Sequence, residues 1–394
     1  HYPPSCVKYI VPFLKGGVRG IFYYVTLIFS NMFSTTPSDC YEIKHNAIIS
    51  PVKVSELGEF GLIDLLAKTV KRKKEDIPPQ VILGIGDDTA AWREDSPIHL
   101  ATTDTMVEGI HFDISKITWE ELGWKSLAVN ISDIAAMGGT SRYALVTLAI
   151  PGDTLVDNVL ALYRGIKEIA GQFNVSIIGG DTVKSHLTII TVALYGTMEN
   201  EAGELMTRSA ALPGEIIGVT GYLGSSAAGL KMVSNDMPVK EEQASYLRKA
   251  HYRPQPRAME GRQLFAAGVR CAIDISDGLI GDLTHVCKTS SVGAILKTDS
   301  LPVHPFVEAN FPGEGTDFAL SGGEDYELLF TAEENLFKRL RQQMSTPITA
   351  IGSITGNNPG KVTLVDKKGN SISRQKKGWD HFRPDNSSPS DPLP

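Results

Sequence analysis

Six short acidic motifs are spread along the chain, and each places a carboxylate beside glycine or at the end of an apolar run. They are Gly84-Ile85-Gly86-Asp87-Asp88, Thr102-Thr103-Asp104, Asn130-Ile131-Ser132-Asp133, Gly179-Gly180-Asp181, Asp274-Ile275-Ser276-Asp277-Gly278 and Ser321-Gly322-Gly323-Glu324-Asp325. Carboxylates that converge in a fold repel one another, and hard divalent cations relieve that repulsion. Mg²⁺ takes oxygen ligands and is commonly shared between one or two carboxylates and the phosphates of a substrate. The motifs therefore indicate a Mg²⁺-dependent enzyme that acts on phosphates.

The first and third motifs differ in how readily a structural role explains them. Asp87 and Asp88 could simply cap a turn, since Gly-Asp pairs commonly do so. Asp133 falls late in a predicted apolar helix, where a negative charge meets the unfavourable end of the helix dipole. A carboxylate at that position needs a cation.

Two later segments also allow a structural interpretation. Ser276 or Asp277 could be an ordinary N-cap of the next helix, but this leaves Asp274 unexplained at the end of an apolar strand. The small-residue segment 221–229 could bind phosphate at a helix start. Close helix packing explains the same small residues equally well, so both interpretations stay open.

Composition limits the classes of protein to consider. The 394 residues are 42% hydrophobic and 21% charged, which gives enough chain for two globular domains. A formal net charge of −7 argues against a nucleic-acid binder. The sequence has no P-loop, no His-Arg-Asp loop and no Ser/His/Asp or Cys/His signature, so metal ions must neutralise most of the phosphate charge. Four widely spaced cysteines without zinc spacing favour a reduced, cytosolic setting.

Apolar periodicity predicts two successive units of mixed helices and strands. In the first unit we expect helices over 56–70, 119–137 and 155–173, and strands over 81–85, 98–103, 143–150, 175–178 and 187–196. In the second we expect strands over 215–220, 271–275, 293–297, 327–331 and 348–351, with helices after 221–229 and over 259–267, 279–289 and 333–344.

Residues 1–53 do not share this pattern. The apolar, aromatic-rich run at 21–33 is shorter than the ~20 residues that a spanning helix needs. A signal peptide would fit its basic flank, but no clean small-residue cleavage site follows. We expect residues 1–53 to be a disordered or non-native extension, such as translated upstream sequence or an incomplete start. Membrane attachment through this segment is the less favoured alternative. The polar residues 383–394 are predicted to be a disordered tail.

The motifs, taken in order, closely resemble the thiamine-monophosphate kinase family over about 54–382. The residues that carry the resemblance are Gly-Glu-Phe-Gly-Leu-Ile-Asp at 58–64, Gly-Ile-Gly-Asp-Asp at 84–88, Thr-Asp-Thr-Met-Val-Glu-Gly-Ile-His-Phe at 103–112, Leu-Ala-Val-Asn-Ile-Ser-Asp-Ile-Ala-Ala-Met-Gly at 127–138, Ile-Gly-Gly-Asp-Thr at 178–182, Thr-Arg-Ser at 207–209, Ile-Asp-Ile-Ser-Asp-Gly-Leu at 273–279, Leu-Ser-Gly-Gly-Glu-Asp-Tyr-Glu-Leu at 320–328 and Lys-Gly-Trp-Asp-His-Phe at 377–382.

The resemblance implies the last step of thiamine diphosphate synthesis, in which ATP gives its γ-phosphoryl group to thiamine monophosphate. It implies a cytoplasmic α/β protein of the α+β two-domain kind, in the ATP-binding superfamily shared with aminoimidazole ribonucleotide synthetase and selenophosphate synthetase. The N-terminal domain, 54–198, would bind ATP and Mg²⁺, and its sheet would pair across a homodimer into a barrel-like core. The second α/β domain would cover 208–382. Neither nucleic acid nor a membrane is an expected partner.

Site residues follow from the same resemblance, motif by motif. Those resembling ligands of several Mg²⁺ ions are Asp88, Thr102, Thr103, Asp104, Asp133, Asp181, Asp274 and Asp277. Those resembling ATP contacts are Gly180, Asp181, Arg208 and Ser276, and those resembling contacts to thiamine monophosphate are His111, Glu324 and Trp379.

The sequence leaves two alternatives. Another ATP-dependent synthetase of the superfamily would share the Asp/Gly framework, but would lack His111, the Glu324 motif and the Gly-Trp-Asp-His-Phe end. A catalytically silent nucleotide or metal sensor is disfavoured because every acidic motif is intact.

Overall fold

The structure, a computed structural model, describes residues 81–83, 90–93, 98–198 and 204–372. All of them belong to one of the two units into which the chain divides, Val52–Pro394. Residues 1–53, the predicted helix over 56–70, the tail over 383–394, Asp88 and Trp379 lie outside the described residues.

The first half of the described chain forms a sheet in the order β1-β2-β3-β6-β4-β5. Its strands are β1 (Val81–Leu83), β2 (Ala90–Arg93), β3 (Ile98–Val107), β4 (Thr140–Ile150), β5 (Ser176–Lys184) and β6 (Ile189–Met198). Only the β4–β5 pair is parallel among these pairings. The first unit is therefore organised by antiparallel pairing, as in α+β proteins, rather than by repeated parallel crossovers.

Two of the strands that extend beyond their predicted ends carry predicted site residues. β3 continues to Val107, so that Asp104 lies inside the strand opposite Val192 instead of at its end. β5 continues to Lys184 and places Asp181 opposite Thr147 of β4. Pairing with a long neighbouring strand outweighs the weak strand preference of Asp and Gly, because strand preference depends strongly on context.

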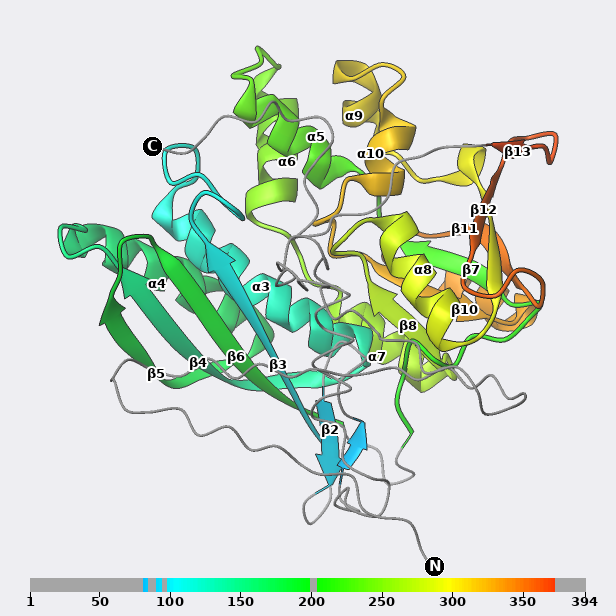
Figure 1. Ribbon diagram of the computed structural model, residues 1–394, viewed down its shortest axis with the longest axis horizontal. Helices are drawn as coiled ribbons and strands as arrows, with labels where there is room; N and C mark the ends of the chain where they lie inside the picture. Colours follow the sequence, from blue (N-terminus) through cyan, green and yellow to red (C-terminus); the bar gives the residue numbers. More distant parts are fainter. Residues whose placement is uncertain (1–80, 84–89, 94–97, 199–203, 373–394) are drawn as a thin grey trace, which may run out of the picture. The chain divides into compact units, whose positions relative to one another are not determined.

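Helices α3 (Trp119–Ala136) and α4 (Val156–Phe173) pack against each other, and α3 packs on β3 and β6 (Figure 1). Thr118 and Glu121 form a capping box that begins α3, and Gly138, at φ +76°, follows its end. The two helices touch backbone to backbone. A Cβ on Gly123 would lie 1.9 Å from the carbonyl oxygen of Leu162, and one on Gly165 would lie 1.9 Å from that of Glu120.

Helix α3 is buried almost all round, because it also packs against elements from the second half of the chain. Those elements are α6 (Glu241–Tyr252), α7 (Ala258–Ala267) and β8 (Cys271–Asp274). The helix therefore carries side chains that meet residues more than a hundred positions away.

The second half forms a sheet in the order β13-β12-β9-β11-β7-β10-β8. Besides β8, its strands are β7 (Ile216–Thr220), β9 (Gly293–Lys297), β10 (Leu328–Ala332), β11 (Ile348–Thr355), β12 (Val362–Val365) and β13 (Ser371–Ile372). The remaining helices are α5 (Ser225–Ser234), α8 (Leu279–Thr289), α9 (Pro305–Asn310), α10 (Gly315–Ser321), α11 (Glu334–Gln343) and the 3₁₀ turn Thr298–Ser300. Along the described ranges, no helix combines the length and apolar character needed to cross a bilayer.

Candidate functional site

Three aspartates from distant parts of the sequence come together where α3 meets both sheets. Asp104 lies on β3, Asp133 near the end of α3, and Asp274 is the last residue of β8. Ser132 donates from Oγ to Asp274 Oδ2 over 2.7 Å, which joins α3 to the second sheet. Thr102 donates from Oγ1 to Asp133 Oδ2 over 2.5 Å, which joins β3 to α3. The structure thus brings together four of the predicted metal-binding residues. We call the three aspartates Asp104, Asp133 and Asp274 the aspartate cluster.

Burial raises the pKa of all three carboxylates of the aspartate cluster, and neighbouring charges add to the rise for Asp104 and Asp133. Burial raises the pKa of Asp104 to about 6, and the charge of Asp274 adds to the rise. Burial, followed by the charges of Asp104 and Asp274, raises the pKa of Asp133 well above its ordinary value. Burial also raises the pKa of Asp274, against the hydrogen bond from Ser132. Three ionised carboxylates in this space are unfavourable without a cation.

A second acidic pair and one arginine adjoin the aspartate cluster. Burial, then the charges of Asp277 and Asp274, raises the pKa of Asp282 on α8 well above its ordinary value. Asp282 Oδ2 accepts the backbone N–H of Asp277 over 3.2 Å. The guanidinium of Arg208 acts in the opposite direction on the pKa of both Asp274 and Asp282. A guanidinium, a group suited to bidentate phosphate contact, therefore lies near these carboxylates, and the ATP contact of Arg208 stays a prediction.

The donor set suits Mg²⁺ better than it suits a metal held entirely by protein. Across the described ranges, no three His, Cys, Asp or Glu side chains are arranged as a ready metal cage. Mg²⁺ commonly uses one or two carboxylates and keeps waters or substrate phosphates as its other ligands. Mutually repelling aspartates with hydroxyl donors behind them provide that kind of partial oxygen site.

Glu324 lies in a separate charged group formed by α3, α6 and the segment after α10. Lys125 Nζ lies 2.7 Å from Glu324 Oε1, and His251 Nδ1 lies 3.4 Å from Glu324 Oε2. Burial opposes ionisation of Glu324, but the charge and hydrogen bond of Lys125, together with the charges of His251 and His111, hold the pKa of Glu324 below its ordinary value. Burial, with Lys125 nearby, lowers the pKa of His251 to about 3, so this histidine is neutral at pH 7. The charge of His111 also acts on Glu324, so two predicted acceptor-binding residues are neighbours.

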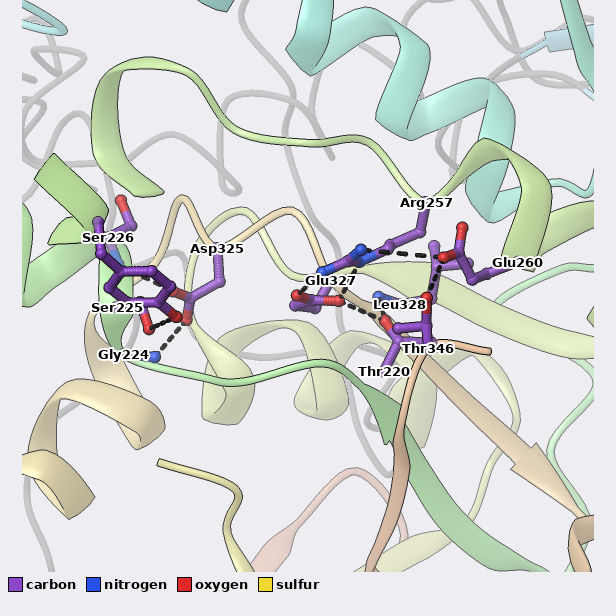
Figure 2. A network of polar contacts seen from close by, with 11 residues as sticks. Thr220, Gly224, Ser225, Ser226, Arg257, Glu260, Asp325, Glu327, Leu328 and Thr346 are labelled. Carbon is purple, nitrogen blue, oxygen red and sulfur yellow. Dashed lines mark hydrogen bonds and ion pairs between the residues drawn. The ribbon is translucent and has the colours of Figure 1, made fainter. Parts of the chain in front are cut away.

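In the segment from Glu324 to Glu327, residues that anchor the main chain alternate with residues that face the charged groups of the site. Asp325 accepts the backbone N–H groups of Gly224 over 2.7 Å and Ser226 over 3.1 Å, as Figure 2 shows. Glu324 and Tyr326 have left-handed backbones, at φ +55° and +50°, which are uncommon outside glycine. Burial, then the charges of Glu324 and Asp104, raises the pKa of Tyr326 well above 10.

Glu327 anchors the other end of this segment. Arg257 donates to both of its carboxylate oxygens, over 2.6 and 2.5 Å, and Thr220 donates to Oε2 over 2.6 Å (Figure 2). Asp325 and Glu327 therefore hold the main chain, while Glu324 and Tyr326 face the charged groups of the site.

Three of the predicted site residues lie apart from the aspartate cluster. The side chain of Thr103 lies on the face of β3 opposite to Thr102 and Asp104, because side chains alternate along a strand. Gly180 and Asp181 lie on the edge strand β5, and β6 and β4 separate it from β3. Three strand spacings amount to roughly 14 Å. These two residues line a hollow of about 480 Å³ together with Tyr163, Ile177, Gly179 and Thr182.

The small-residue segment at 221–229 takes part in packing. Asp325 occupies the backbone N–H groups at the start of α5. A Cβ on Gly229 would lie 2.1 Å from the carbonyl oxygen of Leu247 on α6, so this glycine permits close helix contact. The N-cap of α8 is Gly278 without a side-chain hydrogen bond. The alternative in which Ser276 or Asp277 caps that helix is therefore wrong.

Comparison with known proteins decides the family. Residues 86–198 match the AIR synthase related protein N-terminal domain, and residues 213–365 match the corresponding C-terminal domain. The chain is 36% identical over 336 residues to thiamine-monophosphate kinase of Bacillus subtilis, covering 83% of this chain and 100% of that protein. It is 37% identical over 333 residues to that of Escherichia coli K12, covering 82% and 98%. The chain belongs to the thiamine-monophosphate kinase family.

Solved structures agree with the family assignment. A structure described as AaThiL complexed with AMPPCP and TMP matches with a TM-score of 0.74 and 32% identity, covering 84% of this chain and 99% of that one. Hydrogenase maturation protein HypE in complex with ATP matches at 17% identity with a TM-score of 0.58, which shows a shared fold.

Several residues of this thiamine-monophosphate kinase family site were not found by sequence reasoning. They are Lys125, His251, Arg257, Asp282, Tyr326 and Glu327. A signal was present for Lys125, which interrupts an otherwise apolar helix pattern, and for Glu327, which precedes an apolar strand. Nothing in the local sequence around His251 or Arg257 indicates a buried partner.

Proposed function

We propose that this protein is a Mg²⁺-dependent thiamine-phosphate kinase that transfers the γ-phosphoryl group of ATP to thiamine monophosphate. The products are thiamine diphosphate and ADP, in the last step of thiamine diphosphate biosynthesis. The observation that carries the proposal is the nearly full-length match to AaThiL complexed with AMPPCP and TMP. The convergence of Asp104, Asp133 and Asp274 supports it, because phosphoryl transfer depends on positioning and on neutralising charge.

The aspartate cluster would hold Mg²⁺, with Thr102 orienting Asp133 and Ser132 orienting Asp274. Bound there, Mg²⁺ would neutralise phosphate charge that the carboxylates alone would repel. Further proposed ligands are Thr102, Thr103, Asp88 and Asp277, together with Asp181, which lies apart from the cluster on β5. The number of ions bound together is a question for metal titration.

The nucleotide would contact Gly180, Asp181, Arg208 and Ser276. Arg208 supports this part of the proposal, because its guanidinium already interacts with Asp274 and Asp282. Its planar group can bind phosphate oxygens with two parallel hydrogen bonds. It would screen the transferring phosphate from the acidic residues that surround it.

Thiamine monophosphate would contact His111, Glu324 and Trp379. The thiazolium ring of thiamine carries a positive charge, so an ionised glutamate and an aromatic face are suitable partners. Lys125 contributes most among its neighbours to keeping Glu324 ionised. The proposal needs no general base, because the phosphate of the acceptor is already an anion.

We also propose that the protein is a homodimer formed through the first sheet. The face of this sheet opposite α3 exposes Tyr143 by 51% and Tyr195 by 37%, and edge strand β5 exposes Ile178 by 57%. A second copy of the chain would cover these apolar groups in the barrel-like arrangement that the family resemblance implies. Sedimentation velocity tests this: a monomer at micromolar concentration would refute it.

A turnover assay with thiamine monophosphate, ATP and Mg²⁺ tests the proposed activity. We expect chromatography to show thiamine diphosphate and ADP in equal amounts, with no product when a chelator replaces Mg²⁺. Consumption of a different acceptor while thiamine monophosphate stays unchanged would favour another ATP-dependent synthetase of the superfamily. A cytoplasmic location belongs to the same proposal, supported by the free thiol of the buried Cys287.

A further inference from the structure

Lys125 is a buried charge that the proposed phosphoryl transfer does not use directly. It lies within α3 and its side chain is 0% exposed. Burial of an ammonium group is costly unless a partner of opposite charge lies close to it. Glu324 supplies that partner at 2.7 Å. The pair therefore joins a residue from the first half of the chain to one from the second half.

The two members of this pair differ in their exposure. The side chain of Glu324 is 30% exposed, whereas that of Lys125 is completely covered. Glu324 therefore has one carboxylate oxygen fixed from behind by Lys125 and still presents part of its surface to solvent. Such an arrangement leaves the glutamate able to contact a ligand while the lysine cannot reach it.

The main chain around Glu324 is also fixed. Its backbone N–H donates to the carbonyl oxygen of Ser276 over 2.7 Å, in the motif that carries Asp274. The next residue, Asp325, is held by Gly224 and Ser226. With the backbone constrained at φ +55°, the remaining freedom of Glu324 is that of its side-chain torsions. The contact with Lys125 restricts those torsions.

His251 completes the surroundings of Glu324. Its Nδ1 lies 3.0 Å from Ser226 Oγ and 3.4 Å from Glu324 Oε2, and its side chain is 3% exposed. Because His251 is neutral, the ammonium of Lys125, 2.7 Å away, is the full positive charge that contacts the carboxylate of Glu324. Lys125 therefore holds the orientation of Glu324 and contributes most among its neighbours to keeping it ionised.

We propose that Lys125 is a positioning residue for the phosphoryl acceptor, which acts by holding the carboxylate of Glu324 in one orientation through their ion pair. The inference rests on the proposed function, because it takes thiamine monophosphate as the ligand of Glu324. Lys125 and Asp133 lie eight residues apart on α3, which is about 12 Å along a helix. One rigid helix thus sets the acceptor contact and one metal-binding carboxylate relative to each other.

A double-mutant cycle tests the proposal. The variants are Lys125→Met, Glu324→Gln and the combination, with Lys116→Met as a matched control that removes a surface lysine paired with Asp236. Measurements are kcat, the KM for each substrate, and the dissociation constant of thiamine monophosphate by calorimetry without nucleotide. Circular dichroism and thermal melting show whether each variant folds.

We expect Lys125→Met to weaken thiamine monophosphate binding by about 10-fold or more, the scale seen when a residue that orients a ligand-binding group is lost. The KM for ATP should stay within about twofold. In the Glu324→Gln background, Lys125→Met should cost less than about threefold, because a residue that acts through Glu324 has little to do once that charge is gone. Lys116→Met should leave all constants unchanged.

Three results would overturn the inference while leaving the kinase assignment intact. They are unchanged acceptor affinity in Lys125→Met, an equal rise in both KM values, or the same loss with and without Glu324. If Lys125→Met does not fold, Lys125→Arg carries the test, because it keeps the charge but cannot place it at the same point. It should then weaken acceptor binding at least about threefold with ATP unaffected, and no change would refute positioning. Failure of the wild-type protein to bind and convert thiamine monophosphate would overturn both proposals.

Discussion

Replacement of Asp104 by asparagine should stabilise the metal-free protein while it impairs the enzyme. Asp104 is half-buried and close to Asp274 and Asp133. Asparagine has nearly the same shape, and its amide can donate a hydrogen bond to Asp133. The change therefore removes a repelled charge without leaving a cavity.

The size of the effect follows from the pKa. For Asp104 it rises from 3.8 to about 6 in the folded protein. Such a shift of about two units corresponds to about 3 kcal/mol of destabilisation by the ionised form. Because the side chain is partly exposed, screening by water reduces this to about 2 kcal/mol. The folded-state pKa lies above the unfolded one, so the penalty is absent below pH 3.8, grows toward pH 6 and is complete above it.

Thermal and urea unfolding in a chelating buffer at several pH values measures this. We expect Asp104→Asn to melt about 4 °C above the wild type at pH 7.5, with the difference gone near pH 4. Asp236→Asn is the matched control, because Asp236 is an exposed carboxylate with φ +46°, a conformation that asparagine tolerates well. Added Mg²⁺ and nucleotide should stabilise the wild type more than Asp104→Asn. A variant that is less stable than wild type at pH 7.5 without metal would refute the view that these carboxylates repel one another.

The remaining predictions concern activity, stability and the N-terminal extension. Asp133→Asn and Asp274→Asn should fold but lose about 10²-fold or more in kcat, the scale of a lost electrostatic stabiliser, and near-normal rates at saturating Mg²⁺ would return both to structural roles. Arg257→Met should lower the free energy of unfolding by about 3 kcal/mol, because it leaves the carboxylate of Glu327 buried without its cation. The double variant with Glu327→Gln should recover most of that loss, and urea titration of both variants measures the two free energies. Deletion of residues 1–50 should leave a dimeric, active enzyme, and loss of turnover or membrane flotation of the full chain alone would contradict that expectation.

Local sequence patterns predicted the helices and strands in which the apolar periodicity is clear and the flanking residues mark both ends. The bounds of α8 and β9 coincide with the predicted helix over 279–289 and strand over 293–297, because apolar periodicity is clear and glycine or polar residues flank each. Helix α6 was missed because most of its residues are charged or polar, and only Leu247, His251 and Tyr252 are buried. Its stability comes from packing against α5 and α3, which periodicity cannot reveal.

The candidate site was predictable as a set of motifs, but its internal geometry was not. The acidic motifs contain Asp104, Asp133 and Asp274, which the structure brings together, and metal binding by these residues stays a prediction. The face that each side chain occupies depends on where the strands end and how they pair. The sequence alone therefore could not show that Thr103 and Asp181 lie apart from the aspartate cluster. Long-range pairs such as Lys125 with Glu324 depend on how α3 meets the second sheet. The domain boundaries at 54–198 and 208–382 and the contact at Trp379 stay predictions.

The backbone contact between α3 and α4 also limits how this protein can change through evolution. At Gly123 and Gly165 the obstacle to any larger residue is a main-chain carbonyl oxygen 1.9 Å from the position of a Cβ. No substitution elsewhere can shrink a carbonyl group, so no second mutation in a neighbouring side chain can compensate for alanine at either position. Strict retention of these glycines in related chains would therefore equal that of residues which touch the substrate. Retention of Gly123 or Gly165 is consequently no sign of catalysis, in contrast to retention of Asp133 on the same helix pair.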